Sequence, residues 1–277
     1  MRVGLMVHAR RADAVSYARR AADFLLSAGV EVIAEEDAAP LLGDGVRAFS
    51  ERDSADVILS LGGDGTLLRG AQYALKWNAA LLGVNLGRVG FLAEVEPDTL
   101  EAALAAVIAG RYEIETRPVL KVQAGGETWY AVNDVVVSRG GYARLITIDA
   151  LVDGESSGRY VADGLIVATP TGSTGYSLSA GGPVVSPKVD CMIITPICAH
   201  TLQHRPCVVH GGAEIRLELS PEDVQTASLE VDGQSRMTLT AGTHAHVRKD
   251  ERAIRLIRFR EGRFFGVVRE KLTEWTR

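Results

Sequence analysis

The first 110 residues alternate short apolar runs with longer segments in which apolar residues recur every three or four positions. The short runs are typical of buried strands, and the longer segments are typical of amphipathic helices. The predicted strands are Val3–Val7, Val30–Ala34, Val57–Leu61 and Ala80–Val84, and the predicted helices are Asp13–Ser27, Leu67–Leu75 and Asp98–Ala109. This alternation predicts a parallel sheet with right-handed crossovers, on which ligands bind at the carboxyl ends of the strands.

The pattern changes after about Arg117, where β-rich segments follow one another without helices between them. These segments are Val119–Val122, Thr128–Val137, Leu145–Val152, Leu165–Ala168, Met192–Thr195, Ile215–Leu219, Ser228–Val231 and Ala253–Phe259. Pairs such as Asp153-Gly154 and Asp232-Gly233 separate them and predict turns. We therefore expect a second, all-β domain built from stacked sheets, with a helix over Arg269–Arg277 at the end of the chain.

The segment Leu61 to Thr66 reads Leu-Gly-Gly-Asp-Gly-Thr and lies between a predicted strand and a predicted helix. A glycine turn at this point presents backbone N–H groups to a phosphate. A carboxylate repels phosphate, so the presence of Asp64 indicates one of two roles. Asp64 either holds a metal that bridges phosphates or accepts a proton from an attacking hydroxyl. The structural alternative is an ordinary Gly-Asp-Gly turn. Neither the P-loop nor the dinucleotide glycine pattern is present.

A second candidate segment runs from Ala162 to Pro187 and is rich in glycine and hydroxyl side chains. It offers neutral hydrogen-bonding groups and close backbone approach, which suits a sugar or a base, although an ordinary Ser/Gly loop has the same composition. Asn133 and Asp134 precede the apolar run Val135–Val137. Their amide and carboxylate would satisfy vicinal ribose hydroxyls, but such a pair is also common in structural turns.

Composition narrows the class of protein. The chain has 277 residues, 47% hydrophobic and 23% charged, with a net charge of −5 and a pI of about 5.7, which suits two globular domains. The chain contains no block of like charges, so a nucleic-acid partner is not indicated. No apolar run approaches the roughly 20 residues of a membrane span. The odd cysteine count indicates a reducing, cytoplasmic location. A zinc site at Cys198, His200 and His204 is not favoured, because no Cys-x-x-Cys pair is present and prolines flank the segment.

Several segments together resemble the NAD kinase family. They are Gly62–Thr66, Asn85–Phe91, Asn133-Asp134, Asp163–Pro183, Ile194–Cys198 with His200–Leu202, and Asp232–Gln234, in the order of the family. The resemblance implies a Rossmann-like α/β domain over residues 1–116 and an all-β sandwich domain over 117–264. It also implies a tail, about 265–277, that returns to the first domain, and NAD bound between the domains. Members of the family are Mg²⁺-dependent homodimers or homotetramers that use ATP.

The resemblance also implies roles for individual residues. Asp64 would be the general base for the adenosine 2′-hydroxyl of NAD, which attacks the terminal phosphate of ATP. The residues implied to contact phosphate are Gly62, Gly63, Gly65, Thr66 and Arg69. Those implied to bind the dinucleotide are Asn85, Phe91, Asn133, Asp134, Arg144, Asp163, Thr174, Gly175, Tyr176, Ser177, Ser179 and Gln234. Among them, Asn133 and Asp134 would bind ribose hydroxyls, and Asp163 would hold the nicotinamide end.

Three positions depart from the family pattern. Asp134 stands where glutamate is common, Gly175 replaces an alanine, and Ala199 replaces a proline. None of these departures removes a catalytic group. Two alternative functions remain open at this point: a lipid kinase of the diacylglycerol type that shares the Gly-Gly-Asp-Gly turn, and a non-catalytic NAD-binding regulator. Inorganic polyphosphate also remains open as the phosphate donor.

Overall fold

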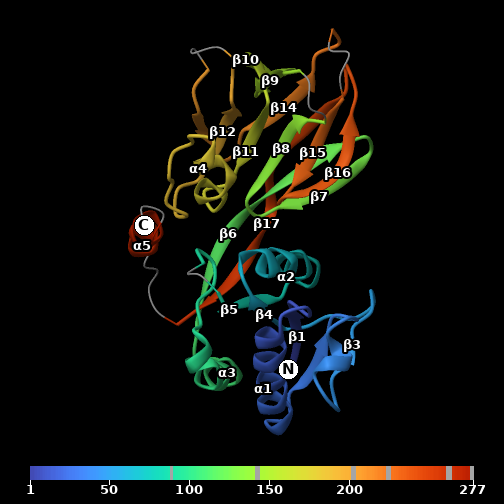
Figure 1. Cartoon of the computed structure of the whole chain (residues 1–277), viewed down its shortest axis with the longest axis vertical. Helices are drawn as coiled ribbons and strands as arrows, with labels where there is room; N and C mark the ends of the chain where they lie inside the picture. Colours follow the sequence, from blue (N-terminus) through green and yellow to red (C-terminus); the bar gives the residue numbers. More distant parts are fainter. Residues whose placement is uncertain (88–89, 141–143, 201–203, 223–225, 260–263, 275–277) are drawn as a thin grey trace. The chain divides into compact units, whose positions relative to one another are not determined.

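The computed structural model describes residues 1–87, 90–140, 144–200, 204–222, 226–259 and 264–274, with side chains as far as residue 270 in the last range. Three predicted segments therefore lie partly outside the described residues: Arg88-Val89 of the first loop, Thr201-Leu202, and the end of the tail at 275–277. The chain forms two compact units, one containing residues 1–116 and 254–277 and the other residues 117–253. Strands β6 (Glu113–Ala124) and β17 (His244–Arg258) pass from one unit to the other (Figure 1).

The first unit contains a parallel sheet. Its strands pair in the order β3 (Arg47–Ala48), β2 (Glu31–Ala34), β1 (Arg2–Val7), β4 (Val57–Gly62) and β5 (Ala80–Asn85). The end of β17 continues this sheet, because Arg255 and Leu256 pair in parallel with β5. The chain changes its direction of travel across the sheet between β1 and β4. In open α/β sheets the ligand crevice forms at such a switch point, at the carboxyl ends of the strands.

Helices cover both faces of this sheet, since successive side chains of a strand point to opposite faces. Leu5 belongs to a core shared with α1 (Ala12–Ser27) and α3 (Leu100–Ile108). Its neighbour Met6 faces α2 (Asp64–Trp77), where a Cβ on Gly70 would lie 3.2 Å from the Met6 side chain. Figure 1 shows α1 and α2 on opposite sides of β1 and β4. The predicted α/β architecture of the N-terminal part is confirmed.

The second unit contains antiparallel sheets. One has the order β13 (Cys207–His210), β12 (Cys191–Ile197), β11 (Gly164–Ala168), β8 (Asp134–Arg139), β15 (Ala227–Val231) and β16 (Gln234–Leu239). The other joins β10 (Glu155–Ala162), β9 (Ile146–Val152), β14 (Glu214–Leu219) and β17, and β6 pairs with β17 and with β7 (Glu127–Ala131). An apolar core with members from both sheets, including Val137, Leu165, Ile148 and Leu217, confirms the predicted all-β unit.

Several predicted boundaries are wrong. Helix α2 begins at Asp64 rather than Leu67, which places the whole Asp-Gly-Thr segment in its first turn. The segment Thr128–Val137 contains two strands, β7 and β8, instead of one. Four strands were not predicted at all: β3, β10, β13 and β16. They are short or rich in polar residues and lie at sheet edges, so the apolar pattern that marks a buried strand is missing from them.

Two more α-helices belong to the described residues. The helix α4 (Tyr176–Ser179) follows β11, and a small apolar cluster of Val136, Ile166 and Ile193 packs with Ala180 and Val185 on that side of the sheet. The last helix, α5 (Phe264–Glu274), begins five residues before the predicted position. Within the described residues, no helix is long and apolar enough to cross a membrane.

Candidate active site

The glycine turn lies at the carboxyl end of β4, at the switch point of the sheet. Gly63 is the N-cap of α2, with φ −93° and ψ −174°, and Asp64 begins the helix. Backbone N–H groups in a first helical turn have no partner within the helix and point toward an anion. Gly63 and Gly65 are exposed, and a Cβ on either would meet no described atom within 4 Å. This end of the helix is therefore open to a phosphate-bearing ligand.

Gly62 and Thr66 close the base of the turn. Thr66 is buried, and its side chain lies over the last residue of β4. A Cβ on Gly62 would lie 2.5 Å from Thr66 Oγ1 and 2.9 Å from Thr66 Cβ. Because atoms cannot approach so closely, only glycine at position 62 lets the helix begin this near the strand.

Asp64 is half-buried and lies against the loop that follows β5. The Phe91 N–H donates to Asp64 Oδ2 at 3.5 Å, and a Cβ on Gly90 would lie only 2.4 Å from Asp64 Oδ1. The loop also begins in an ordered way, because buried Asn85 accepts a hydrogen bond from the Gly87 N–H at 3.2 Å. The carboxylate thus sits between a helix N-terminus and a backbone that approaches it closely, and any side chain at position 90 would displace it.

Arg69 lies on α2, one turn after Asp64, and its guanidinium is already engaged. It donates to both Glu35 carboxylate oxygens at 2.7 Å and to the Val7 carbonyl at 2.9 Å. Glu35 directly follows β2, so this ion pair lies at the same carboxyl edge of the sheet as Asp64. In this arrangement Arg69 fixes the edge of the site, and its contact with phosphate stays a prediction.

Asn133 and Asp134 lie at the start of β8 in the second unit, beside the Gly-rich segment that follows β11. The Thr169 N–H donates to the Asn133 carbonyl at 2.8 Å, and a Cβ on Gly172 would lie 2.1 Å from that carbonyl oxygen. On the far side of the segment, a Cβ on Gly175 would lie 3.9 Å from Asp134 Oδ2. The two predicted sugar-binding segments are therefore neighbours in space.

The pKa of the Asp134 carboxyl is raised to about 7, first by burial and then by the nearby charges of Asp232 and Glu230. The folded protein consequently holds this proton more tightly than the unfolded chain does. The stability that comes from this proton is complete below about pH 4 and is lost as the pH rises through about 7. At higher pH the buried carboxylate costs stability unless a ligand satisfies it.

We expect Asp134→Asn to be more stable than the parent protein by about 2 kcal/mol at pH 8, because the amide carries no charge into the buried site. The difference should shrink as the pH falls to 5. Urea unfolding at both pH values measures it. Asp149→Asn is the control, since this carboxylate is more exposed and pairs with Arg159 at 3.4 Å; it should change stability by less than about 0.5 kcal/mol. Equal effects at pH 5 and pH 8 would contradict the explanation.

The residues of the hydroxyl-rich segment differ in exposure. Tyr176 is 47% exposed, and burial followed by the nearby Glu230 and Cys198 raises the pKa of its phenol. Ser179 is exposed, and Thr174 is half-buried. Ser177 is fully buried and hydrogen-bonds Thr195 at 2.8 Å, so its described contact is internal to the protein. Tyr176 and Ser179 thus offer the open face of this segment.

Three further predicted residues lie elsewhere on the second unit. Asp163 precedes β11 and forms an ion pair with Arg139 at 3.1 Å. Gln234 begins β16 and is exposed, and it follows the turn formed by Asp232 and Gly233. Arg144 is exposed. The charge of Asp163 also contributes to the raised pKa of the Tyr176 phenol, after burial, Glu230 and Cys198.

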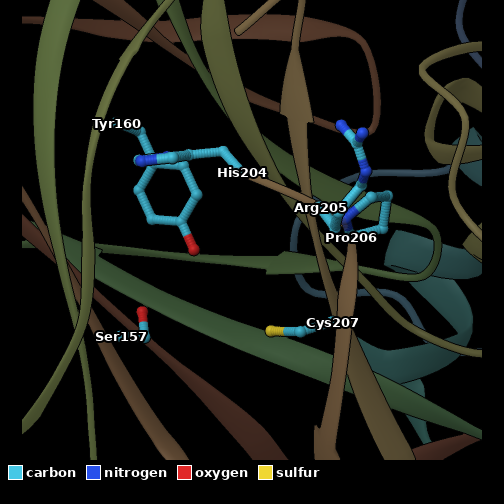
Figure 2. Close-up of a pocket in the computed structure, with 6 residues that line it drawn as sticks. All are labelled: Ser157, Tyr160, His204, Arg205, Pro206 and Cys207. Carbon is cyan, nitrogen blue, oxygen red and sulfur yellow. The ribbon is translucent and has the colours of Figure 1, made fainter. Parts of the chain in front are cut away.

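A separate cavity of about 310 Å³ contains none of the predicted site residues. It is lined by Ser157, Tyr160, His204, Arg205, Pro206 and Cys207 (Figure 2). The imidazole of His204 packs edge-on against Tyr160 with ring centroids 4.5 Å apart. In the described part of the chain, no group of three or more His, Cys, Asp or Glu side chains could hold a metal ion.

Several residues that shape these sites were not found from the sequence. Glu35 binds Arg69, Gly90 borders Asp64, and Asp232 accepts hydrogen bonds from the backbone around Asn133. Glu35 carried a usable signal, since it directly follows a predicted strand of a parallel sheet. Asp232 lies in the segment Asp232–Gln234, where only Gln234 was predicted to bind a ligand. Gly90 lay inside the family-like segment Asn85–Phe91, but its particular role depends on a contact with a residue 26 positions away.

The comparisons with known proteins cover both units. Residues 3–112 match the model of the ATP-NAD kinase N-terminal domain, and residues 132–259 match that of the ATP-NAD kinase C-terminal domain. The chain belongs to the NAD kinase family. A relative named NAD kinase from Desulforamulus reducens is 38% identical over 281 residues, which cover 99% of this chain and 97% of that protein.

Solved structures agree with this assignment. Yeast NADH kinase complexed with NADH has a TM-score of 0.88 and 27% identity, over 99% of this chain and 87% of that one. An NAD kinase from Archaeoglobus fulgidus in complex with ATP has a TM-score of 0.77 and 30% identity, over 97% and 99%. As a member of the NAD kinase family, the chain is an enzyme, a kinase that transfers phosphate to NAD. The lipid kinase and the non-catalytic regulator are thereby set aside.

Proposed function

We propose that this NAD kinase transfers the terminal phosphate of ATP to the adenosine 2′-hydroxyl of NAD⁺, with Asp64 as the general base. The observation that carries the proposal is the position of the Asp64 carboxylate. It lies in the first turn of α2, beside the open backbone of Gly63 and Gly65, where phosphate groups bind best. A carboxylate at that point is poorly placed for holding phosphate and well placed for accepting a proton.

The chemistry asks little of the pKa of Asp64. Phosphoryl transfer proceeds through a loose transition state, so it depends mainly on positioning and on neutralisation of charge. The ribose hydroxyl is a very weak acid, and its proton leaves late, when the bond to phosphorus is forming. Asp64 can orient the hydroxyl oxygen early and accept its proton at that later point. Gly90 and Phe91 would restrain the carboxylate in the required direction.

The second unit would bind the dinucleotide. Asn133 and Asp134 offer an amide and a carboxyl to vicinal ribose hydroxyls, and Tyr176 offers an exposed ring nearby. A buried carboxyl that gains two hydroxyl donors on binding is compensated for its burial. The yeast structure with NADH and the Archaeoglobus structure with ATP support binding of a pyridine dinucleotide and of ATP by this chain as well.

We also propose a requirement for Mg²⁺. Magnesium in kinases keeps several waters and is held by one or two carboxylates together with substrate phosphates. The open turn at Gly63 and Gly65 fits that mode, because substrate phosphates bound there would supply ligands to the ion. When bound, the ion would neutralise charge on the phosphate groups of the donor. We also propose that the enzyme is an oligomer, on the ground of the family resemblance. A cytoplasmic location is proposed because the thiols of Cys191, Cys198 and Cys207 are free.

The direct test is formation of NADP⁺ by the purified protein with NAD⁺, ATP and Mg²⁺. Inorganic polyphosphate in place of ATP identifies the donor, and an excess of EDTA tests the metal. NADP⁺ formed with ATP and suppressed by EDTA would support the proposed donor, acceptor and metal requirement. If NADP⁺ forms with polyphosphate alone, the donor is wrong while the acceptor stands. If the product carries its new phosphate on the 3′-hydroxyl, the regiochemistry is wrong.

We expect Asn133→Ala to raise the KM for NAD⁺ by about tenfold, because the loss of hydrogen bonds to a ribose costs about 1–2 kcal/mol. The KM for ATP should stay within about twofold of the parent value, since the residue lies in the unit assigned to the dinucleotide. Steady-state kinetics with each substrate varied in turn measures both values. An unchanged KM for NAD⁺ would exclude Asn133 from the site.

A further inference from the structure

The carboxylate of Asp232 accepts hydrogen bonds from three consecutive backbone N–H groups. Its Oδ2 accepts from Val132 at 2.9 Å, and its Oδ1 accepts from Asn133 at 2.8 Å and from Asp134 at 3.3 Å. These donors belong to the chain segment that enters β8. The two oxygens of one side chain therefore fix the backbone at the point where both proposed ribose-binding side chains begin. We call these three contacts the Asp232 anchor.

The backbone of Asp232 strengthens this attachment. Asp232 and Gly233 form the turn between β15 and β16, with φ values of +48° and +73°. The Asp232 N–H donates to the Asp134 carbonyl at 3.0 Å, so the two residues are joined in both directions. In the adjoining strands Val231 pairs with Val135, which sets the register of the turn against β8. The anchor is thus rigid at its base, and its position is fixed by the sheet.

We propose that Asp232 is a positioning residue for dinucleotide binding, which holds the Asn133-Asp134 backbone so that both side chains face the same ribose. The proposal rests on the proposed role of Asn133 and Asp134. Asp232 contributes through the backbone of the pair and makes no contact with substrate. A displacement of about 1 Å at a binding group is enough to cost much of its contribution, so the anchor sets the affinity for NAD⁺.

A carboxylate is the side chain that this geometry requires. Both of its oxygens are acceptors, whereas asparagine offers one acceptor oxygen and an NH₂ group that donates only. In Asp232→Asn, the amide nitrogen would face at least one of the three N–H donors. Hydrogen bonds from backbone N–H groups to a charged carboxylate are also stronger than those to a neutral amide. The substitution preserves side-chain shape while it breaks one or two of the three contacts of the Asp232 anchor.

The test combines kinetics with hydrogen exchange on Asp232→Asn in the full-length protein. We expect the KM for NAD⁺ to rise by at least about tenfold, with kcat within about threefold and the KM for ATP within about twofold of the parent values. The amides of Val132, Asn133 and Asp134 should exchange faster. Should this variant fail to fold, Asp232→Glu serves the same test, because it keeps the charge and moves the carboxylate by one methylene.

Asp153→Asn is the matched control. Asp153 also lies in an Asp-Gly turn with a positive φ, of +52°, and its Oδ1 accepts the Glu214 N–H at 2.8 Å. It belongs to the turn between β9 and β10, and its described side-chain hydrogen bonds join it to Glu214 and His210, neither of which is a proposed site residue. The control should leave the exchange of the Val132, Asn133 and Asp134 amides and the KM for NAD⁺ unchanged, because its amide oxygen can still accept from the Glu214 N–H. This separates the loss of a carboxylate charge in an Asp-Gly turn from the loss of site geometry.

The outcomes distinguish the positioning role from the proposed function. If the parent protein forms no NADP⁺, the proposed function fails, and the dissociation constants for NAD⁺ of parent and variant, measured by calorimetry, still test the anchor. If the three amides lose protection while the KM or dissociation constant for NAD⁺ stays unchanged, the positioning role is wrong. If kcat falls while the KM for NAD⁺ stays unchanged, the positioning role is also wrong.

Discussion

Asp64→Asn is expected to lower kcat by about two to four powers of ten while the fold stays intact. The amide keeps an oxygen that can accept from the Phe91 N–H, and its shape fits the space beside Gly90, so the side chain stays in place. It no longer accepts a proton from the ribose hydroxyl at a useful rate. The loss therefore falls on the chemical step, and the KM for NAD⁺ should change by less than about threefold.

Steady-state kinetics and thermal unfolding of the Asp64→Asn variant check this expectation together. Lys76→Gln is the control on the same helix, because Lys76 is exposed in the last turn of α2, at the end away from Asp64. It should retain kcat within about tenfold. A loss of less than tenfold in Asp64→Asn would refute the role of general base and leave Asp64 as an orienting group.

Arg258→Ala is expected to destabilise the first unit by about 3 kcal/mol. Arg258 is 8% exposed, and its guanidinium contacts two carboxylates, Glu94 at 3.0 Å and Glu115 at 2.7 Å, as well as the Leu92 carbonyl at 3.0 Å. Removing the cation leaves two largely buried carboxylates without their shared partner. The Phe259 N–H, which donates to Glu94, would remain as a weaker contact.

Urea unfolding at neutral pH measures this loss. Arg255→Ala is the matched control on the same strand, because its guanidinium makes an exposed hydrogen bond to the Asn78 carbonyl at 3.1 Å. It should cost less than about 0.5 kcal/mol. Similar losses in the two variants would show that the buried ion network contributes no more than an exposed contact. Arg258→Ala should also loosen the chain at Leu92, close to the loop that borders Asp64.

The Asp64 and Arg258 variants test different properties of the same unit, its chemistry and its stability. Asp64 takes part in the proposed chemistry, while Arg258 ties the last strand to the segment that follows Phe91. Residues 92 to 94 lead directly from the loop that restrains the carboxylate, and β17 arrives there from the far end of the chain. The stability of the phosphate-binding unit therefore depends on residues more than 160 positions apart, which no local pattern relates.

The sequence alone determined the fold class, the strand–turn–helix at Asp64 and the family. Buried parallel strands read as continuous apolar runs, and a glycine turn at a strand end is a local feature, so both are visible without tertiary information. The start of α2 was misplaced by three residues because Asp64 and Gly65 are weak helix formers whose helical state is imposed by packing of Thr66 on Gly62.

Only the tertiary structure decided which backbone lies against which side chain. The contact of Gly90 with Asp64, the pairing of Arg69 with Glu35 and the anchor of Asp232 on Asn133 each join segments from different strands. The raised pKa of Asp134 likewise arises from burial and from charges that the chain brings in from β15 and its turn. Hydrophobic patterning is a local property that can be recognised in the sequence, whereas the geometry of a site depends on distances set by the register of the sheets.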